Sequence, residues 1–253
     1  MRGLAGKLAL VTGAAGGIGQ ALSRRFVEEG ATVAALDRDA AGLARLAGAL
    51  GLDKLHPATA DICDHRAVAD AVAAIIARFG RIDILVNNAG WDAPKQFLDT
   101  SPDFWNQVIA INLIGPLNLH HTVLPHMVKA GGGAVVNIAS DAGRVGSSGE
   151  AVYSACKGGI IAFTKTLARE CARHAIRLNA VCPGPTDTPL LRSFAEEGEY
   201  GAKLYEGLKR AIPLKRLGRP EDLPGIVAFL ASEDAGFITG EVISVSGGLT
   251  MHG

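Results

Sequence analysis

The octapeptide TGAAGGIG (Thr12–Gly19) is the stretch that decides the fold of this chain. It follows residues 7–11, a short apolar run without polar alternation, which is typical of a strand buried on both faces. After it, apolar residues recur every four positions from Ile18, which predicts a helix that ends at Gly30. The sequence therefore begins with a strand, a glycine-rich loop and a helix.

A second apolar run at residues 32–36 predicts a strand, and Asp37 comes directly after it. Strand, glycine loop, helix, strand and acid form a dinucleotide-binding βαβ unit, in which a pyrophosphate lies at the helix N-terminus and the acid accepts ribose hydroxyls. The spacing departs from GxGxxG, so a plain βα turn is the alternative interpretation. The cofactor-binding residues predicted here are Gly13, Gly16, Gly17, Ile18, Gly19, Asp37 and Arg38.

Asp37 also bears on which dinucleotide binds. A carboxylate at this position accepts a hydrogen bond from a 2′-hydroxyl and repels a 2′-phosphate, which favours NAD over NADP. Arg38 works against this inference, because a guanidinium can pair with the phosphate or stack on adenine. We expect NAD.

Further strands are predicted at residues 55–59, 83–86, 134–138, 176–181 and 241–245. Helices are predicted after Asp64, from Ser101 to about residue 129 with a break near Gly115, around Tyr153, and at residues 221–231. This alternation indicates an α/β Rossmann fold: one doubly wound domain over residues 1–253, with a mainly parallel seven-stranded sheet and helices on both faces. Residues 185–219 are charged and irregular, as expected of a substrate lid.

Composition excludes several classes of function. The 253 residues carry 25 basic and 25 acidic side chains, so no basic field is expected to hold nucleic acid. No apolar run approaches the roughly 18 residues of a membrane span, and no signal peptide is expected. Four cysteines lack paired spacing, which predicts reduced thiols in a cytoplasmic protein. Three histidines (His120, His121 and His126) lack accompanying ligands, so we expect a helix face or subunit interface and no metal.

Tyr153 and Lys157 are four residues apart, so on a helix they share one face. An ammonium about 5 to 6 Å from a phenol favours the phenolate by about 3 kcal/mol at an effective dielectric near 20, or about two pKa units. The pair is therefore a candidate general acid–base, with a lowered tyrosine pKa. A solvated surface pair is the alternative.

Taken together, the motifs resemble those of the short-chain dehydrogenase/reductase (SDR) family. The resemblance spans nearly the whole chain and includes the loop at 12–19, Asn87-Asn88-Ala89-Gly90, Asn112, Ser140, Tyr153-x3-Lys157 and Pro183-Gly184. It implies a nicotinamide-dependent oxidoreductase with a catalytic tetrad of Asn112, Ser140, Tyr153 and Lys157. Further cofactor contacts implied by the resemblance are Asp61, Ile62, Asn88, Ala89, Gly90, Tyr153, Lys157, Pro183, Gly184, Thr186 and Thr188.

In this resemblance Tyr153 exchanges a proton with the substrate oxygen, and Ser140 hydrogen-bonds the same oxygen. Lys157 binds the nicotinamide ribose and lowers the pKa of the tyrosine, while Asn112 holds a water that links Lys157 to solvent. The cofactor carries the hydride.

Three segments, at residues 87–92, 140–150 and 245–253, are similar to a subgroup that oxidises 2-hydroxycyclohexane-1-carboxyl-CoA, a β-hydroxyacyl-CoA, in the degradation of alicyclic and aromatic acids. Trp91, Ser140, Arg144 and Tyr153 are the expected substrate-binding residues. Basic residues in or beside the lid suit the phosphates of coenzyme A, with a solvated surface as the alternative; they are Arg192, Lys209, Arg210, Lys215, Arg216 and Arg219.

Two alternative functions stay open. One is an NADPH-dependent 3-oxoacyl-carrier-protein reductase or general carbonyl reductase, against which Asp37 argues. The other is a non-catalytic NAD-binding sensor or partner subunit, although all four tetrad positions are filled. The resemblance also implies a homotetramer formed through the helices of Asn112 and Tyr153, where small residues at 158–168 permit close packing.

Overall fold

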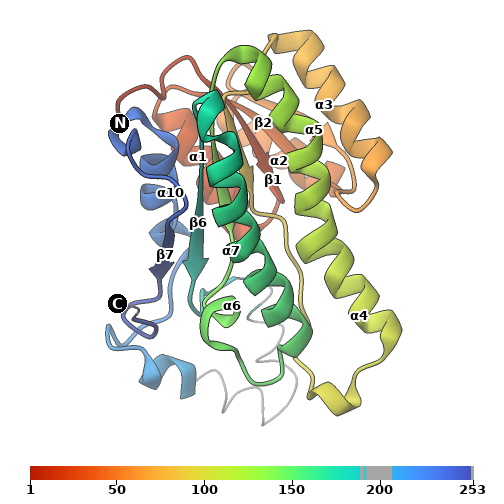
Figure 1. Cartoon of the computed structure of the whole chain (residues 1–253), viewed down its shortest axis with the longest axis vertical. Helices are drawn as coiled ribbons and strands as arrows, with labels where there is room; N and C mark the ends of the chain where they lie inside the picture. The colour runs from red at the N-terminus through yellow and green to blue at the C-terminus, as the bar shows by residue number, and fades with distance from the viewer. Residues whose placement is uncertain (189–190, 192–206, 252–253) are drawn as a thin grey trace.

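A seven-stranded sheet forms the centre of the computed structural model, which describes residues 1–188, 191 and 207–251 (Figure 1). The strands run in the order β3-β2-β1-β4-β5-β6-β7, and every neighbouring pair is parallel. Their bounds are β1 Leu8–Thr12, β2 Thr32–Asp37, β3 Leu55–Thr59, β4 Ile84–Asn87, β5 Gly133–Ile138, β6 Ile176–Pro183 and β7 Val242–Val245. All seven predicted strands are present, and the predicted Rossmann-type α/β fold is confirmed.

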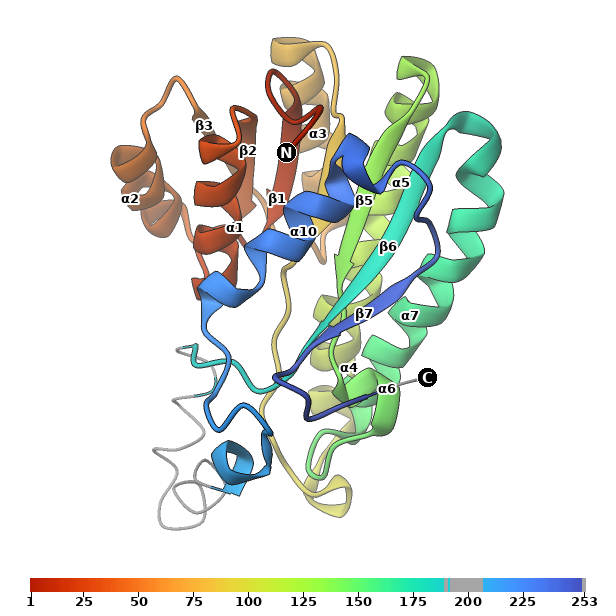
Figure 2. The same ribbon diagram turned by 90° about the vertical axis from the view of Figure 1, so that its left-hand side faces the viewer.

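Helices cover both faces of the sheet, as predicted. Figure 2 shows α1, α2 and α10 on one side of the sheet and α3, α5 and α7 on the other. The helix bounds are α1 Gly17–Glu28, α2 Ala40–Leu50, α3 His65–Phe79, α4 Pro102–Ile109, α5 Gly115–Ala130, α6 Ala142–Val145, α7 Ala151–Cys171 and α10 Pro224–Ala231. Two of them, α2 and the single turn α6, fall where no helix was predicted.

Each sheet face has its own apolar core, because successive side chains of a strand point to opposite faces. In β1, Ala9 and Val11 join the core beneath α1, α2 and α10, while Leu8 and Leu10 join the core beneath α3, α5 and α7. All five residues of β1 are buried, which agrees with the unbroken apolar run. Burial on both faces holds the central strands rigidly.

The predicted break in the long helical stretch is a widened turn directly before Gly115-Pro116, and it has a clear cause. Between α4 and α5 the chain makes a π-helical turn, η2, over Ala110–Ile114, and the N–H of Gly115 donates to the carbonyl of Ala110. Pro116 has no N–H to donate to the fourth residue before it, so an ordinary α-helical bond is missing there. The widened turn therefore precedes Gly115-Pro116, and it carries Asn112.

Strand order reverses beside β1, since the chain passes outward through β2 and β3 and then returns to β4 on the other side. In open α/β sheets, ligands bind outside the carboxyl ends of the strands at this reversal. The glycine loop follows β1, and the Asn87–Gly90 segment follows β4, so both motifs lie at that point. None of the described helices is both long and apolar enough to cross a bilayer.

Candidate active site

A cavity of about 750 Å³ opens along the carboxyl ends of the strands. Every residue predicted to bind the cofactor lines it, from the glycine loop through Asp61 and Ile62 to Thr188, as do Trp91 and Ser140. Asn112 and Arg144 are the two predicted site residues that do not line it. The sequence motifs therefore converge on one cavity large enough for a dinucleotide and a substrate.

The glycine loop is packed so tightly that side chains cannot enter it. A Cβ on Gly19 would lie 2.0 Å from the carbonyl oxygen of Gly13, and one on Gly13 would lie 2.8 Å from the Cα of Ala89. Gly13 also has a φ of +63°, in the left-handed region that favours glycine. These two positions explain the glycine spacing: the loop folds against the Asn87–Gly90 segment and leaves its backbone facing the cavity.

The N-terminus of α1 provides the donors for an anion. Its N-cap, Gly16, makes no side-chain capping bond, and the first turn of the helix (Gly17, Ile18 and Gly19) lines the cavity. Unpaired N–H groups and the positive end of the helix dipole together bind phosphate well. The residues present therefore fit a dinucleotide pyrophosphate.

Asp37, at the end of β2, is held in place by backbone donors. Its carboxylate accepts hydrogen bonds from the N–H of Ala15 and the N–H of Asp39, both at 3.0 Å. The acid is thus fastened to the glycine loop at the edge of the cavity. Arg38 is exposed and lines the same cavity, so both side chains that bear on the choice of cofactor are present.

Asn88 has a supporting contact that the sequence did not indicate. Its side-chain amide donates to the carbonyls of Thr12 at 2.9 Å and Gly13 at 3.2 Å. In return, the Thr12 hydroxyl accepts hydrogen bonds from the N–H groups of Asn88 and Ala89. Thr12 and Asn88 therefore join the glycine loop to the Asn87–Gly90 segment. Asn88 also lines the cavity, as predicted.

Three members of the predicted tetrad meet at the ends of β5 and α7. Ser140 follows β5, and its side chain forms a hydrogen bond with Tyr153. Lys157, 3% exposed, places its ammonium 5.5 Å from the centre of the Tyr153 ring and donates to the carbonyl of Ile138 at 3.0 Å. One helix turn separates tyrosine and lysine, so the pair shares a face as predicted.

Asn112 reaches the site through the π-helical turn. Its side chain is fully buried, donates to the carbonyls of Trp91 at 2.6 Å and Val108 at 3.0 Å, and accepts from the N–H of Trp91. A Cβ on Gly90 would lie 3.0 Å from the Asn112 oxygen and 3.4 Å from the Lys157 nitrogen. Gly90 therefore leaves room where these two side chains approach each other.

The predicted lowering of the tyrosine pKa is wrong in this structure. Burial raises the pKa of Tyr153 well above its usual value, and the nearby charge of Glu150 raises it further, while the Ser140 hydrogen bond offsets a part. Burial also lowers the pKa of Lys157 to about 8. The helix geometry is as expected, but desolvation of both groups outweighs their attraction.

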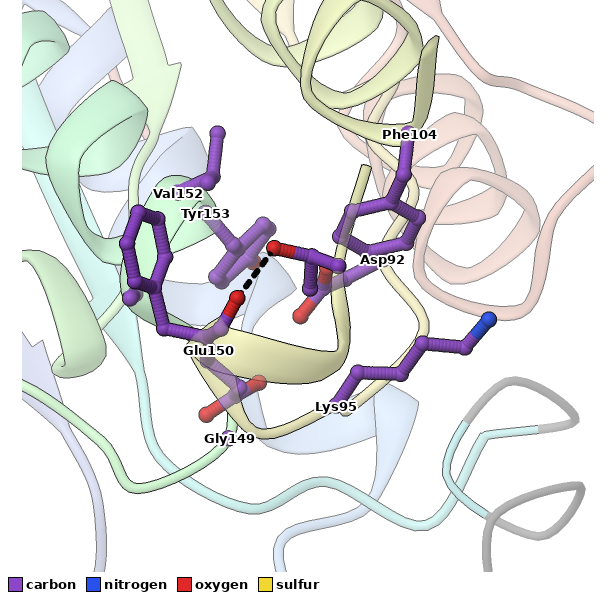
Figure 3. Close-up of a pocket in the computed structure, with 10 residues that line it drawn as sticks. Asp92, Lys95, Phe104, Gly149, Glu150, Val152 and Tyr153 are labelled. Carbon is purple, nitrogen blue, oxygen red and sulfur yellow. Dashed lines mark hydrogen bonds between the residues drawn. The ribbon is translucent and has the colours of Figure 1, made fainter. Parts of the chain in front are cut away.

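Two carboxyl groups, Asp92 and Glu150, lie beside Tyr153 and were given no role by the sequence analysis. They line a small pocket with the tyrosine, and Lys95 and Phe104 line it as well (Figure 3). Burial, and the charge of Glu150, raise the pKa of Asp92 to about 7, and burial also raises the pKa of Glu150. No motif spacing connects two residues so far apart in the sequence.

We expect Asp92→Asn to stabilise the protein at alkaline pH. The pKa of Asp92 is about 7 when folded against a usual value of 3.8, so the folded state binds more protons between these values and stability falls as pH rises through that window. Asparagine removes this penalty, which is at most about 4 kcal/mol. Urea unfolding at about pH 8 should show the gain, and the gain should shrink toward pH 4. Equal stability at pH 8 would contradict the assignment.

Arg144 and Arg216 bind other parts of the protein in this structure. Arg144 donates to the carbonyl of Val242 and the hydroxyl of Ser244, both at 3.0 Å, and thus fastens α6 to β7 instead of facing a substrate. In the expected basic lid, Arg216 forms a two-pronged ion pair with Asp222, so its charge is already balanced. Arg192 lies outside the described residues, and none of the described basic residues of the lid lines the cavity.

The histidines of α5 do not form a metal centre in the part of the chain that the structure describes. His120 is buried, its Nδ1 lies 2.7 Å from the carbonyl of Pro116, and its ring meets Phe163 edge-on. Burial lowers the pKa of His120 to about 4. It is therefore a neutral packing residue.

Comparison with known proteins identifies the class that this fold and site define. Residues 13–250 match the adh_short_C2 family, described as enoyl-(acyl carrier protein) reductase. The chain belongs to this family, and hence to the nicotinamide-dependent short-chain dehydrogenases/reductases. It is an oxidoreductase.

Particular relatives span nearly the full length. The chain is 39% identical over 250 residues to the 3-oxoacyl-[acyl-carrier-protein] reductase FabG of Thermotoga maritima, covering 98% of this chain and 99% of the relative. It is 40% identical over 255 residues to human (3R)-3-hydroxyacyl-CoA dehydrogenase, covering 96% and 95%. The structure of a 3-ketoacyl-(acyl-carrier-protein) reductase from Brucella melitensis, complexed with NADH, superposes with a TM-score of 0.91 at 34% identity, covering 98% and 100%.

Proposed function

We propose that the protein is an NAD-dependent dehydrogenase that interconverts the secondary hydroxyl of a β-hydroxyacyl thioester and the corresponding ketone. The observation that carries this proposal is the meeting of Ser140, Tyr153 and Lys157 at a cavity also lined by the glycine loop and Asp37. The substrate class rests on relatives that are named for 3-oxoacyl or 3-hydroxyacyl thioesters. Within that class, 2-hydroxycyclohexane-1-carboxyl-CoA is the particular substrate we propose.

The nicotinamide supplies the hydride acceptor for oxidation and the hydride donor for reduction. Tyr153 then exchanges the proton: in reduction the phenol gives it to the substrate oxygen, and in oxidation the phenolate receives it. Ser140, which forms a hydrogen bond with Tyr153, also donates a hydrogen bond to the substrate oxygen and stabilises the charge that develops on it. The raised pKa of Tyr153 keeps the phenol protonated at neutral pH, so oxidation should speed up as pH rises.

Lys157 and Asn112 complete the proposed proton path. The buried ammonium of Lys157 lies over the tyrosine ring and stabilises the phenolate when it forms. Asn112 fixes the backbone at Trp91, next to the ammonium, where we propose that it positions a water leading to solvent. The glycine loop and α1 orient the dinucleotide, and Asp37 receives its ribose hydroxyls.

A reductase of 3-oxoacyl carrier-protein thioesters is the second candidate, favoured by the relative from Thermotoga maritima. It would run the same chemistry in reverse and draw on NADPH. Arg38 at the cavity edge is the residue that could serve its 2′-phosphate. The choice between the two functions depends on whether Asp37, which favours the 2′-hydroxyl of NAD, or Arg38, which favours the 2′-phosphate of NADP, has the larger effect on cofactor binding.

Cofactor preference separates these candidates. With 3-hydroxybutyryl-CoA as substrate, we expect kcat/KM to be at least about tenfold higher with NAD than with NADP, because charge repulsion of about 1.4 kcal/mol at Asp37 is sufficient. Absorbance of the reduced cofactor gives both values. A preference for NADP would overturn the NAD assignment. Parallel assays with 2-hydroxycyclohexane-1-carboxyl-CoA test the particular substrate, which should give the higher kcat/KM.

We also propose a homotetramer and a cytoplasmic location. Gly159 on α7 has only Leu113 near the position of a Cβ, and Ala155 and Ala162 are exposed, which supports close packing of this helix against a copy. Light scattering should give four chains per particle, and a monomer at micromolar concentration would refute the assembly. The free thiols of all four cysteines support a reducing compartment.

A further inference from the structure

Asp92 and Glu150 come from two segments that are held together by their backbones. Asp92 follows the Asn87–Gly90 motif, and Glu150 precedes α7. The N–H of Lys95 donates to the carbonyl of Gly149 at 2.8 Å, which ties the two segments side by side. The two carboxyl groups are in hydrogen-bonding contact, and both line one small pocket with Tyr153.

Position links this pair to the reaction. Glu150 and Tyr153 line the main cavity, and both also line the small pocket that contains Asp92. That pocket, of about 10 Å³, has about the room of one water molecule. Glu150 is therefore the member of the pair that faces the same cavity as Tyr153, and Asp92 lies behind it in the small pocket.

The carboxyl group of Asp92 has one oxygen that its described neighbours do not satisfy. It is 4% exposed, and its Oδ2 atom has no hydrogen-bond partner among the described residues. Buried carboxylates are normally satisfied by donors. The nearby cations balance it only in part: the amine of Lys95 lies over the ring of Phe104, and the charge of Lys157, whose amine donates to Ile138, offsets less than burial and Glu150 impose.

We propose that Asp92 and Glu150 form a carboxyl pair that selects the substrate, admitting a neutral group beside the reacting carbon and excluding a carboxylate. Two carboxyl groups in contact hold a proton between them, because both cannot ionise at low cost. The pair therefore offers one O–H donor, which a thioester carbonyl can accept, and one negative charge, which repels a free acid. The raised pKa values of both groups are consistent with such sharing. This inference rests on the proposed function, since it names the feature that separates thioesters from free acids.

The test compares two probes of equal carbon skeleton, 3-hydroxybutyrate and its methyl ester, neither of which carries coenzyme A. Dissociation constants are measured calorimetrically in the presence of NAD for the wild type, Asp92→Asn, Glu150→Gln and the double variant. Asp103→Asn, an exposed carboxyl on α4, is the matched control. Thermal unfolding confirms that each variant folds.

We expect the wild type and the Asp103→Asn control to bind the ester at least about tenfold more tightly than the acid. The double variant should lose this ratio, because its amides carry no charge, and the single variants should fall between. Equal affinity for both probes in the wild type, or a ratio that the double variant retains, would overturn the proposal. Binding reports on the pair even if neither probe is oxidised, whereas absent turnover with every thioester would count against the proposed function alone.

Discussion

Tyr153→Phe should lower kcat for oxidation of a β-hydroxyacyl thioester by about 10²- to 10⁴-fold, the usual contribution of general acid–base catalysis. The substitution removes only the phenolic oxygen, which forms a hydrogen bond with Ser140 and which we propose as the proton donor and acceptor for the substrate. The ring that packs under Lys157 stays in place. Affinity for NAD, measured by fluorescence titration, should therefore change little.

The neighbouring residue supplies a control for this variant. Ser154 also carries a buried hydroxyl, but its oxygen has no hydrogen-bond partner among the described residues. Ser154→Ala should keep wild-type kcat. A Tyr153→Phe variant with undiminished turnover would show that the proton goes elsewhere and would refute the mechanism.

Lys157→Met should also abolish most of the activity, by about 10²-fold or more, without lowering stability. Methionine has a similar length but no ammonium, so the phenolate of Tyr153 loses the cation that lies over its ring. Burial disfavours the charged form of Lys157 and thus lowers its pKa from 10.5 to about 8 in the folded state. At pH 7 its removal relieves up to about 3 kcal/mol, which offsets the loss of the hydrogen bond to Ile138.

The effect of Lys157→Met on the free energy of unfolding should depend on pH. A lowered lysine pKa means that the unfolded state binds more protons between about pH 8 and 10.5, so wild-type stability rises over that range. The difference in unfolding free energy between Lys157→Met and the wild type should therefore move in favour of the wild type above pH 8. Lys165→Met, at an exposed position of the same helix, is the control and should leave both activity and stability unchanged. A variant that unfolds at neutral pH would show that the lysine is structural.

The sequence predicted the parts of this fold that local patterns determine. Apolar runs located all seven strands, most clearly β1, which is buried on both faces and shows no polar alternation, while the edge strand β3 is partly exposed. Helix α2 was missed, although Asp39 caps it by accepting a hydrogen bond from Gly42. The helix break was predicted within a few residues, because Pro116 has no N–H to donate to the turn before it and the widened π-helical turn over Ala110–Ile114 accommodates this loss.

The site shows a similar division. Residues that share a motif, such as the Tyr153–Lys157 pair, were placed correctly because one helix fixes their spacing. The pKa of the tyrosine was not, because it depends on burial and on the carboxyl groups Asp92 and Glu150, whose loops are brought together in the fold by contacts such as the Lys95–Gly149 hydrogen bond. Arg144 was misplaced for the same reason: its partners on β7 lie far along the sequence.

The most direct measurement of the central claim follows the transferred hydrogen. A β-hydroxyacyl-CoA carrying deuterium on its carbinol carbon is oxidised by the wild-type protein with NAD, and the product cofactor is examined by mass spectrometry. We predict one deuterium in each reduced nicotinamide formed by the wild type, and almost no reduced nicotinamide formed by Tyr153→Phe. Reduced cofactor without deuterium, or no turnover with any thioester tested, would contradict it.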